Sequence, residues 1–480
     1  MGLRIGQTVP ADWWIPGQSE DNVIPGTCEI TKEGGIVAKL HRNPLRSAGQ
    51  ASLLAAPLED IPLLHGSIFG TPVTLVDCRM GPATTKFTPQ ADIELRPWLA
   101  LEGLLLGDEE LVVSEAQVRL RHQRIWASWS PFSYEFEESS LQPKRLAYHA
   151  PAGRVTAIPG GTLSIEDDSV FWPRPQQGDA EIKSQCKFVV SLDSPLPLRD
   201  FLPQYILPLE TLISLATTSI ARIESLHVTD KSWIASATES GRSNLLKVWF
   251  GRSPSQDDFR DITSQDLLFL LSDYRWEEVG GNLFSILPNW RYIIDQWITL
   301  INRNYRWPIP RFLTAVTIVE AVDRMLYLDN VSDRAKEYDQ IASNVDAALA
   351  SVAGLNSKRR ARIRKLIANS YEPSLEDRLK RLSVRVACGL VPLNLPDNWA
   401  KRVAALRNQI SHGLPAVHDL ARDHRGAQVG EAILLHLLES LFLAELGFTT
   451  EELEKAMMRR AQLGWRASTI SRNIDSLPES

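Results

Sequence analysis

The spacing of hydrophobic positions divides this chain of 480 residues into regions of different character. Up to about residue 200, short apolar segments alternate with glycine, proline and other turn-forming residues, a pattern typical of strands. From Ile262 onward glycine becomes scarce and apolar residues recur every three or four positions, which indicates amphipathic helices. The pattern predicts an α+β multidomain protein, with a β-rich N-terminal domain over 1–200, a mixed α/β continuation or connector over 201–289, and an all-α helical bundle over 290–470.

The N-terminal region is predicted to contain hairpins and longer strands. Lys32–Gly35 and Gly70–Thr71 are turn sequences that lie between pairs of apolar segments, as in hairpins. Three prolines between 195 and 203 mark a break before a helix predicted over Tyr205–Ile223. The predicted strands are Thr27–Ile30, Ile36–Leu40, Gly66–Phe69, Pro72–Val76, Glu115–Ser128, Lys187–Leu192, Ser225–Val228 and Leu245–Phe250.

The helices predicted for the second half have recognisable ends. Proline suits the first turn of a helix, which predicts one helix over Pro310–Leu328. Ser374–Asp377 and Thr449–Glu452 have the spacing of capping boxes, and Gly447 is placed to end the apolar helix before it. A further helix is predicted from Pro396 to the Gly413-Leu-Pro sequence, with one apolar face.

The net charge of −6 conceals two halves of opposite sign. Residues 1–290 carry 25 basic and 36 acidic groups, whereas residues 291–480 carry 27 basic and 22 acidic groups. The stretch 351–410 alone holds 13 basic and 4 acidic groups. A basic second half indicates a polyanionic partner, although solvated helix faces would produce the same count.

Several classes of protein are disfavoured by what the sequence lacks. The four cysteines are far apart, which indicates neither a zinc ribbon nor a redox pair. The first residues have no apolar signal region, and the apolar run Ala432–Leu446 contains charged residues, so we expect a cytoplasmic protein that does not bind a membrane. Phosphate-loop, dinucleotide-binding, nucleophile-elbow and zincin motifs are missing, so we expect neither a cofactor nor a metal.

The segment Arg407-Asn-Gln-Ile-Ser-His412 combines residue types that suit RNA cleavage. The ribose 2′-hydroxyl can act as the nucleophile, so the protein needs only a group that transfers protons and a group that stabilises the phosphorane. Histidine suits the first task and the planar guanidinium of arginine suits the second. The competing interpretation is an ordinary helix end with an exposed arginine and a capping histidine.

Helical geometry places these three side chains on different parts of one helix. Asn408 and His412 are four residues apart, so the amide could orient the ring. Arg407 and His412 are about 140° apart around an ideal helix. We therefore expect them to meet only if the chain unwinds near 411–413 or if a second subunit completes the site.

The same segment fits the Arg-polar-x-x-x-His motif of the HEPN superfamily of helical-bundle ribonucleases, and it too lies late in a helical bundle. Other segments resemble the opening helices of the ApeA-like HEPN domain and parts of the ApeA N-terminal domain. They are Trp290–Tyr292, Arg311–Leu313 and Ile318–Val322 for the former, and Ile61–Gly66 and Gly70–Cys78 for the latter. Over most of its length the chain thus resembles the ApeA-like anti-phage HEPN ribonucleases.

This resemblance implies a metal-independent endoribonuclease of bacterial anti-phage (abortive infection) defence, a toxin that cuts host or phage RNA, often tRNA, and leaves a 2′,3′-cyclic phosphate. It also implies a homodimer or higher homo-oligomer formed through the HEPN bundle, and a phage-derived trigger at the N-terminal domain. By the same resemblance Arg407 stabilises charge, Asn408 is the polar second position and His412 transfers protons.

Two non-enzymatic hypotheses compete with a ribonuclease. In the first, a non-catalytic HEPN module serves dimerisation or RNA binding as a sensor or scaffold. In the second and weaker one, the bundle is the partner of a nucleotidyltransferase. A scaffold has no chemical need for Arg407, Asn408 and His412 together, so the intact set favours the enzyme.

Two acidic residues lie toward the apolar side of the helix predicted over Pro310–Leu328, where carboxylates usually have a partner. Glu320 could pair with Arg407 and hold it for phosphate, or it could form a local bridge to Arg324. Asp323 is the second of these residues, and we expect it to be paired as well.

The basic stretch 358–365 could follow an RNA backbone or could be a solvated helix face. Lys401 and Arg402 could extend such a surface toward His412. The candidate RNA-binding residues are Lys401, Arg402, Arg359 and Arg360.

Two groups of histidines and tryptophans are better explained without a ligand. His418 and His424 repeat the spacing from His412, but the three do not share a helical face, so metal binding is not expected. The pairs Trp13–Trp14 and Trp126/Trp129 could stack on a base or a peptide, but such residues more often anchor a β-domain core.

Overall fold

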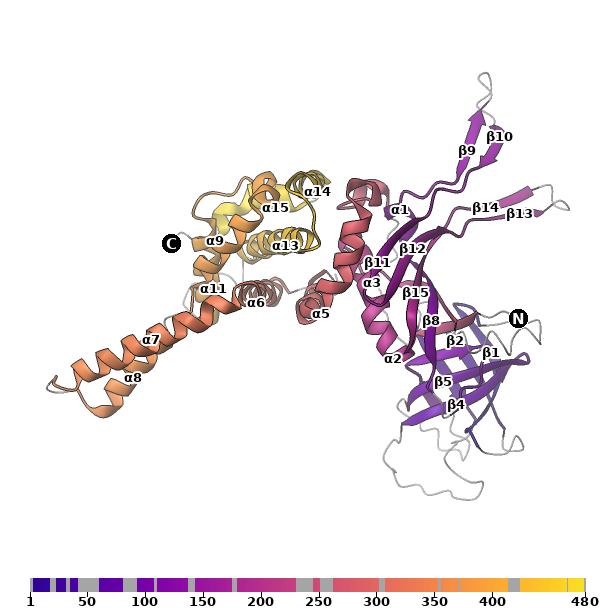
Figure 1. The fold of residues 1–480 in the computed structure, drawn as a ribbon, viewed down its shortest axis with the longest axis horizontal. Coiled ribbons are helices and arrows are strands. Elements are labelled where there is room, and N and C mark those ends of the chain that lie inside the picture. Colours follow the sequence, from indigo (N-terminus) through magenta and orange to yellow (C-terminus); the bar gives the residue numbers. More distant parts are fainter. Residues whose placement is uncertain are drawn as a thin grey trace. The chain divides into compact units, whose positions relative to one another are not determined.

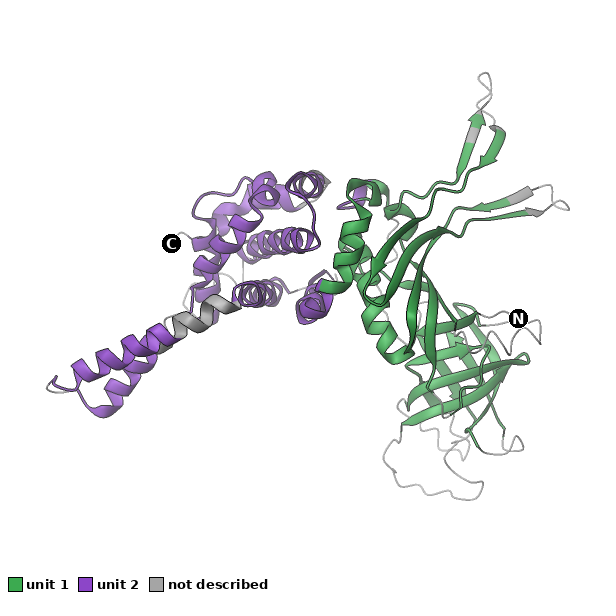
Figure 2. Cartoon of the chain, viewed as in Figure 1, with its two compact units in different colours: residues 1–264, 270–285 green, residues 265–269, 286–480 purple. Residues whose placement is uncertain are grey.

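The chain divides into two compact units in the computed structural model (Figure 2). Unit 1 comprises residues 1–264 and 270–285, and unit 2 comprises residues 265–269 and 286–480. The structure describes residues 3–17, 23–31, 35–41, 60–80, 93–107, 110–136, 143–174, 179–229, 245–250, 262–301, 307–352, 355–369, 372–412, 424–463 and 465–478.

Unit 1 is built on one antiparallel sheet in which six strands close on themselves, because β6 pairs with both β3 and β5 (Figure 1). The closed strands are β1 (Gln7–Trp14), β2 (Ile24–Ile30), β3 (Ile36–Leu40), β4 (Ile61–Ile68), β5 (Thr71–Met80) and β6 (Ile93–Arg96). The sheet continues through β7 (Leu99–Glu102), β17 (Leu246–Phe250), β16 (Ile223–Thr229), β8 (Val112–Leu120), β15 (Cys186–Pro197), β12 (Gly161–Asp167) and β11 (Arg154–Ile158).

Short helices and two outlying hairpins complete unit 1. The hairpins project from the sheet in Figure 1. They are β9 (Phe132–Phe136) with β10 (Pro143–Tyr148), and β13 (Val170–Arg174) with β14 (Asp179–Lys183). The helices are α1 (Gln123–Trp126), α2 (Leu198–Phe201), the π-helical turn η2 (Leu202–Ile206) and α3 (Leu207–Thr217).

The predicted hairpins are confirmed, with one shift in position. β2 pairs with β3, and β4 pairs with β5, in the expected antiparallel sense. The turn between β4 and β5 consists of Phe69 and Gly70, one residue earlier than expected, and both have positive φ angles of 49° and 77°. Two such residues in a two-residue loop match the right-handed twist of the flanking strands, which explains the tight connection.

The strand predicted over Glu115–Ser128 is wrong in its second half, because β8 ends at Leu120. His122 adopts a left-handed conformation with φ 67°, which ends the extended path. The side chain of Gln123 then accepts a hydrogen bond from the backbone N–H of Leu120 at 3.0 Å. This cap satisfies a strand-end donor and allows the chain to turn into α1.

The break predicted at the prolines between 195 and 203 lies at the second of them, where β15 ends at Pro197 and α2 begins at Leu198. Strand β15 continues through Pro195 and Pro197, and its pairing with β8 shifts register between Ser191 and Leu196. Proline has no backbone N–H to donate to a regular ladder of hydrogen bonds, but an irregular register tolerates it. The helix predicted over Tyr205–Ile223 ends early, because Thr218 adopts a left-handed conformation with φ 48°.

Trp13, Trp126 and Trp129 lie in the core of unit 1, as the simpler of the two hypotheses predicts, and Trp14 is half-buried. Trp126 is fully buried and packs against Phe188 and Trp276, with ring centroids 5.7 Å and 5.9 Å away. Trp13 is fully buried against Gly66, where a β-carbon would come within 2.3 Å of the indole ring. These rings are therefore not available to stack on a base.

Unit 2 is an all-α bundle, which confirms the predicted fold class. Helix α5 (Trp276–Ile301) begins in unit 1 and ends in unit 2. The other helices are α6 (Pro308–Leu326), α7 (Leu328–Leu349), α8 (Ser357–Asn369), α9 (Leu375–Arg385), α10 (Ala387–Leu390), α11 (Trp399–His412), α13 (Arg425–Glu445), α14 (Thr450–Leu463) and α15 (Trp465–Asn473).

Helix α13 forms the centre of this bundle and contacts α6, α9, α10, α11, α14 and α15. Among the described residues it is the one helix long and apolar enough to cross a membrane, but 89% of its most apolar window is buried inside the protein. This burial is what a core helix requires. The capping boxes at Ser374–Asp377 and Thr449–Glu452 are confirmed, and Gly447 follows α13 with a φ of 95°.

Buried polar residues on α13 are held by partners from neighbouring helices. Glu431 accepts two hydrogen bonds from Arg311 of α6, at 2.8 Å and 2.6 Å. Glu439 is fully buried and pairs with Arg466 at 2.6 Å. His436 is fully buried and its Nε2 lies 2.9 Å from the carbonyl oxygen of Gly389. These contacts fix the register of α13 against the surrounding helices.

The free energy of unfolding of unit 2 is expected to fall as the pH is lowered from about 6.5 to about 4. Burial lowers the pKa of His436 from 6.5 to about 4, so in this window the unfolded chain binds a proton that the folded chain does not. The loss should amount to about 3 kcal/mol. Urea unfolding at pH 7 and pH 4.5 measures it, and the variant His436→Gln should show a flatter dependence. An equally steep dependence in that variant would contradict the assignment.

Candidate active site

Arg407 of α11 and Glu320 of α6 form an ion pair, with Nη2 and Oε1 3.6 Å apart. Close packing brings the two helices together. A β-carbon on Gly430 of α13 would lie 2.6 Å from the ring of Phe312 on α6 and 3.5 Å from Leu406 on α11. Because Gly430 has no side chain, the three helices can meet beside Arg407.

Of the two partners considered for Glu320, the structure selects Arg407. Arg324, the local alternative, lies 3.6 Å from Glu372. The expected pairing of Asp323 is confirmed, since Arg378 and Arg381 approach its carboxylate to 2.8 Å and 2.6 Å. Glu320 is thus a half-buried carboxylate on α6 that pairs with an arginine of α11.

The spacing of Asn408 and His412 suggested that the amide orients the ring, but the amide oxygen of Asn408 is bound to Arg407 instead. This oxygen, Oδ1, accepts a hydrogen bond from Nη1 of Arg407 at 3.1 Å. Arg407 is therefore held from two directions, by the carboxylate of Glu320 and by the amide of Asn408, while 35% of its side chain remains exposed. A guanidinium fixed in this way keeps N–H groups directed at solvent, where they can bind an anion.

His412 is exposed and is the last residue of α11. The helix is continuous from Trp399 to His412. The chain therefore does not unwind between Arg407 and His412, as it would have to do to bring the two side chains together. The two side chains consequently lie on different faces, about 140° apart. A single copy of unit 2 presents the cation and the imidazole separately.

The candidate RNA-binding residues do not form one surface. Arg402 is buried, with 8% of its side chain exposed, and it donates a hydrogen bond to the carbonyl oxygen of Leu477 at 2.7 Å. Its assignment as an RNA-binding residue is wrong, because a buried guanidinium bound to the chain cannot reach a phosphate. Lys401, in contrast, is exposed on α11.

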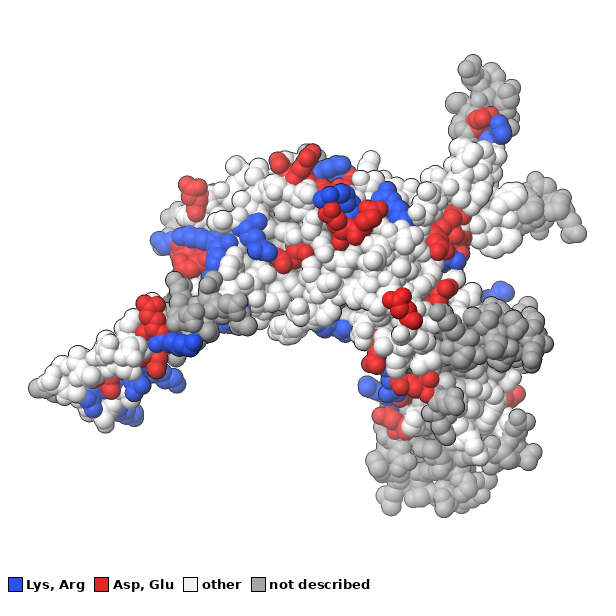
Figure 3. Space-filling view, viewed as in Figure 1, with Lys and Arg blue, Asp and Glu red and all other residues white. Residues whose placement is uncertain are grey.

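Arg359 and Arg360 lie on α8, which packs against α7 as a helical hairpin. Arg359 is exposed and Arg360 is half-buried. Figure 3 shows basic side chains along this hairpin, with a few acidic ones among them. Arg364 and Asp339, for example, approach to 3.9 Å. The stretch is thus a mixed solvated face that retains exposed cations.

Of the other two histidines of the motif region, the structure describes one. His418 lies outside the described residues, and His424 occupies the N-cap position of α13 without a capping hydrogen bond from its side chain. Among the residues that are described, no group of three or more His, Cys, Asp or Glu side chains could hold a metal ion.

Two family models match the chain, and together they cover most of it. Residues 11–290 match ApeA N-terminal domain 1, and residues 313–452 match Apea-like HEPN. No curated protein and no solved structure matches. HEPN domains are generally ribonucleases that dimerise and bind RNA. The chain therefore belongs to the ApeA-like HEPN proteins, and this membership supports a nuclease-type role in anti-phage defence.

Proposed function

We propose that unit 2 is a metal-independent endoribonuclease of bacterial abortive-infection defence, which cleaves RNA, principally tRNA, in the cytoplasm. The observation that carries the proposal is the half-exposed guanidinium of Arg407, held by Glu320 and Asn408 on the helix that ends at His412. An arginine restrained at a surface in this way suits a doubly charged phosphorane. In this proposal a phage-derived trigger acts on the N-terminal domain.

In the proposed reaction, the 2′-oxygen of the ribose attacks the adjacent phosphorus. The P–O bond to the 5′-oxygen of the next nucleotide breaks, which leaves a 2′,3′-cyclic phosphate and a free 5′-hydroxyl. The 2′-hydroxyl loses a proton and the departing 5′-oxygen gains one. His412 transfers one of these two protons, and solvent exchanges the other. Arg407 stabilises the charge on the non-bridging oxygens, while Glu320 and Asn408 position the guanidinium.

A homodimer supplies the geometry that one chain lacks. Arg407 and His412 face apart on α11, so an imidazole from one subunit and a guanidinium from the other would form a composite site where two α11 helices meet. Two such sites would arise by symmetry in each dimer. The family's general tendency to dimerise supports this arrangement.

Mixing two inactive variants tests the composite site. Arg407→Ala and His412→Ala are each expected to be inactive on tRNA in EDTA. If the mixture exchanges subunits, half of the dimers contain one intact composite site, so cleavage should recover to about a quarter of the wild-type rate. Absence of recovery after confirmed subunit exchange would contradict the composite site. Equal cleavage by both variants and the wild type would remove Arg407 and His412 from the mechanism, whereas tRNA binding without cleavage by the wild type would favour the non-catalytic RNA-binding alternative.

Glu320→Gln is expected to lower the cleavage rate about fivefold, because a half-buried ion pair at 3.6 Å contributes about 1 kcal/mol to holding Arg407. Since Glu320 acts through Arg407, the double variant with Arg407→Ala should be no slower than Arg407→Ala alone. Single-turnover rates measure both effects. Glu337→Gln on α7, an exposed position, is the matched control. Additive losses in the double variant would show that Glu320 does not act through Arg407.

A further inference from the structure

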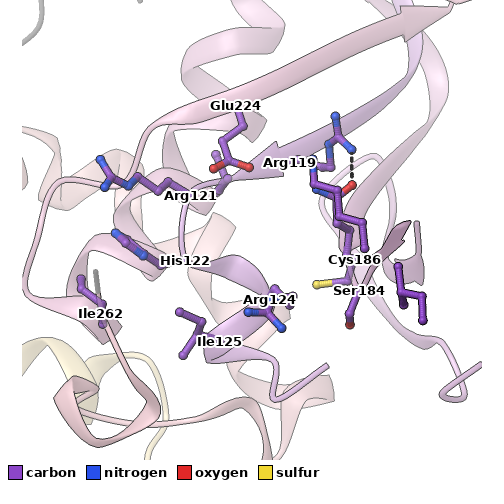
Figure 4. Close-up of a pocket in the computed structure, with 13 residues that line it drawn as sticks. Arg119, Arg121, His122, Arg124, Ile125, Ser184, Cys186, Glu224 and Ile262 are labelled. Atoms are coloured by element: carbon purple, nitrogen blue, oxygen red, sulfur yellow. Dashed lines mark hydrogen bonds between the residues drawn. The ribbon is translucent and has the colours of Figure 1, made fainter. Parts of the chain in front are cut away.

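A pocket of about 520 Å³ lies in unit 1, far in sequence from the proposed ribonuclease residues (Figure 4). It opens where β8 ends and the chain turns into α1, beside the junction of β14 with β15 and the beginning of β16. Its volume is within the range of small-molecule sites. The cationic wall comes from consecutive elements, because Arg119 belongs to the end of β8, Arg121 to the turn that follows it and Arg124 to α1. Figure 4 shows the side chains of Arg119 and Arg121 extending in different directions.

The lining of this pocket has the opposite charge to its domain. Arg119, Arg121, Arg124 and Lys183 line it with His122, against one carboxylate, that of Glu224. Residues 1–290 as a whole carry 25 basic and 36 acidic groups. A concentration of cations in a concave site within an acidic domain focuses a positive potential there.

Two of the arginines that line the pocket differ in exposure and in hydrogen bonding. Arg119 donates to Ser225 Oγ at 2.8 Å and to Asp168 Oδ2 at 2.9 Å, so it is a fixed part of the wall. Arg124 is exposed, and Figure 4 shows its guanidinium near Ser184 and Cys186. Burial raises the pKa of the Cys186 thiol to about 12, so this thiol stays protonated and the pocket is suited to binding rather than to nucleophilic chemistry.

We propose that this pocket binds a phosphate-bearing small molecule of nucleotide size. Guanidinium groups bind phosphate through paired hydrogen bonds, and the pocket supplies those of Arg121 and Arg124 together with the ammonium group of Lys183, while Arg119 remains bound to the wall. Ile125, Ile182 and Ile262 line the same pocket and give the uncharged part of the ligand an apolar surface. The site would make the N-terminal domain a receptor for a nucleotide, independently of the ribonuclease residues.

Isothermal titration of the full chain with the four ribonucleoside triphosphates, and with the matching nucleosides, tests this proposal. At least one triphosphate should bind, and its nucleoside should not. Arg124→Ala should weaken binding at least about tenfold, because a charge-assisted hydrogen bond is lost. Arg145→Ala, an exposed arginine of the same unit outside the pocket, should bind as the wild type does. Arg407→Ala should also retain binding, which places the ligand outside the proposed active site.

Substitution of the one lining carboxylate gives an effect of the opposite sign. Glu224→Gln removes the repulsion between a carboxylate and phosphate, so binding should become tighter by a few-fold. Higher salt should weaken binding in the wild type and in this variant. Failure of all four triphosphates to bind would overturn the proposal. The proposal would also be overturned if Arg407→Ala abolished triphosphate binding, or if the chain bound a short RNA and none of the triphosphates.

Discussion

Replacing His412 by alanine is expected to lower the rate of RNA cleavage by a factor of about 100 to 10,000, the usual contribution of a general acid–base group. Without the imidazole, no group of α11 can move a proton to or from the reacting oxygens at neutral pH. Because the side chain of His412 is exposed at the end of α11, the variant should unfold at the wild-type temperature. Single-turnover cleavage of tRNA in EDTA, together with a thermal unfolding curve, measures both outcomes.

A matched histidine variant separates chemistry from general damage. His149 is exposed in unit 1, so His149→Ala should cleave RNA at the wild-type rate. Cleavage by His412→Ala within tenfold of the wild-type rate would remove His412 from the proposed mechanism. A large loss shared by His149→Ala would show that the assay reports folding rather than catalysis.

Replacing Asp323 by alanine is expected to destabilise unit 2 by about 3–5 kcal/mol, the usual cost of removing one member of a buried ion pair. The carboxylate of Asp323 is fully buried and receives hydrogen bonds from Arg378 at 2.8 Å and from Arg381 at 2.6 Å. Arg378 is itself almost completely buried, so its charge would lose its partner without gaining access to water. The loss should separate α6 from α9, which also packs against α11.

Equilibrium urea unfolding, followed by the helical circular dichroism signal, measures this change. Asp339→Ala on α7 is the control, since Asp339 is exposed and lies 3.9 Å from Arg364. Its free energy of unfolding should differ from that of the wild type by less than about 0.5 kcal/mol. Equal stabilities of the two variants would contradict the structural role given to Asp323.

Local signals in the sequence predict some of the elements, but neither all of their ends nor their assembly. Hairpins and capping boxes depend on a few adjacent residues, so the β2–β3 hairpin and the box at Ser374–Asp377 could be predicted. The closure of six strands depends on β6 meeting β3 and β5, and no local pattern encodes such a pairing. The end of β8 at Leu120 depends on the conformation of His122, which the alternation of side chains does not reveal.

The candidate site shows the same division. The segment from Arg407 to His412 is local and could be recognised, but the choice of Glu320 as partner depends on the packing of both α6 and α11 against α13. The burial of Arg402 follows from its position in the sequence, because this residue is three positions after Trp399 and four before Leu406, on the buried face of the helix. The cationic pocket of unit 1 was missed because Lys183 meets Arg121 and Arg124 only after the strands have paired.

Analysis of the RNA ends produced by the wild-type chain in EDTA tests the central claim most directly. The proposed transesterification predicts cleavage without divalent metal, with a 2′,3′-cyclic phosphate on one fragment and a 5′-hydroxyl on the other. A 2′-deoxy substitution at the cleaved nucleotide should block the reaction. Cleavage that requires a divalent metal, or that leaves a 5′-phosphate, would contradict the account.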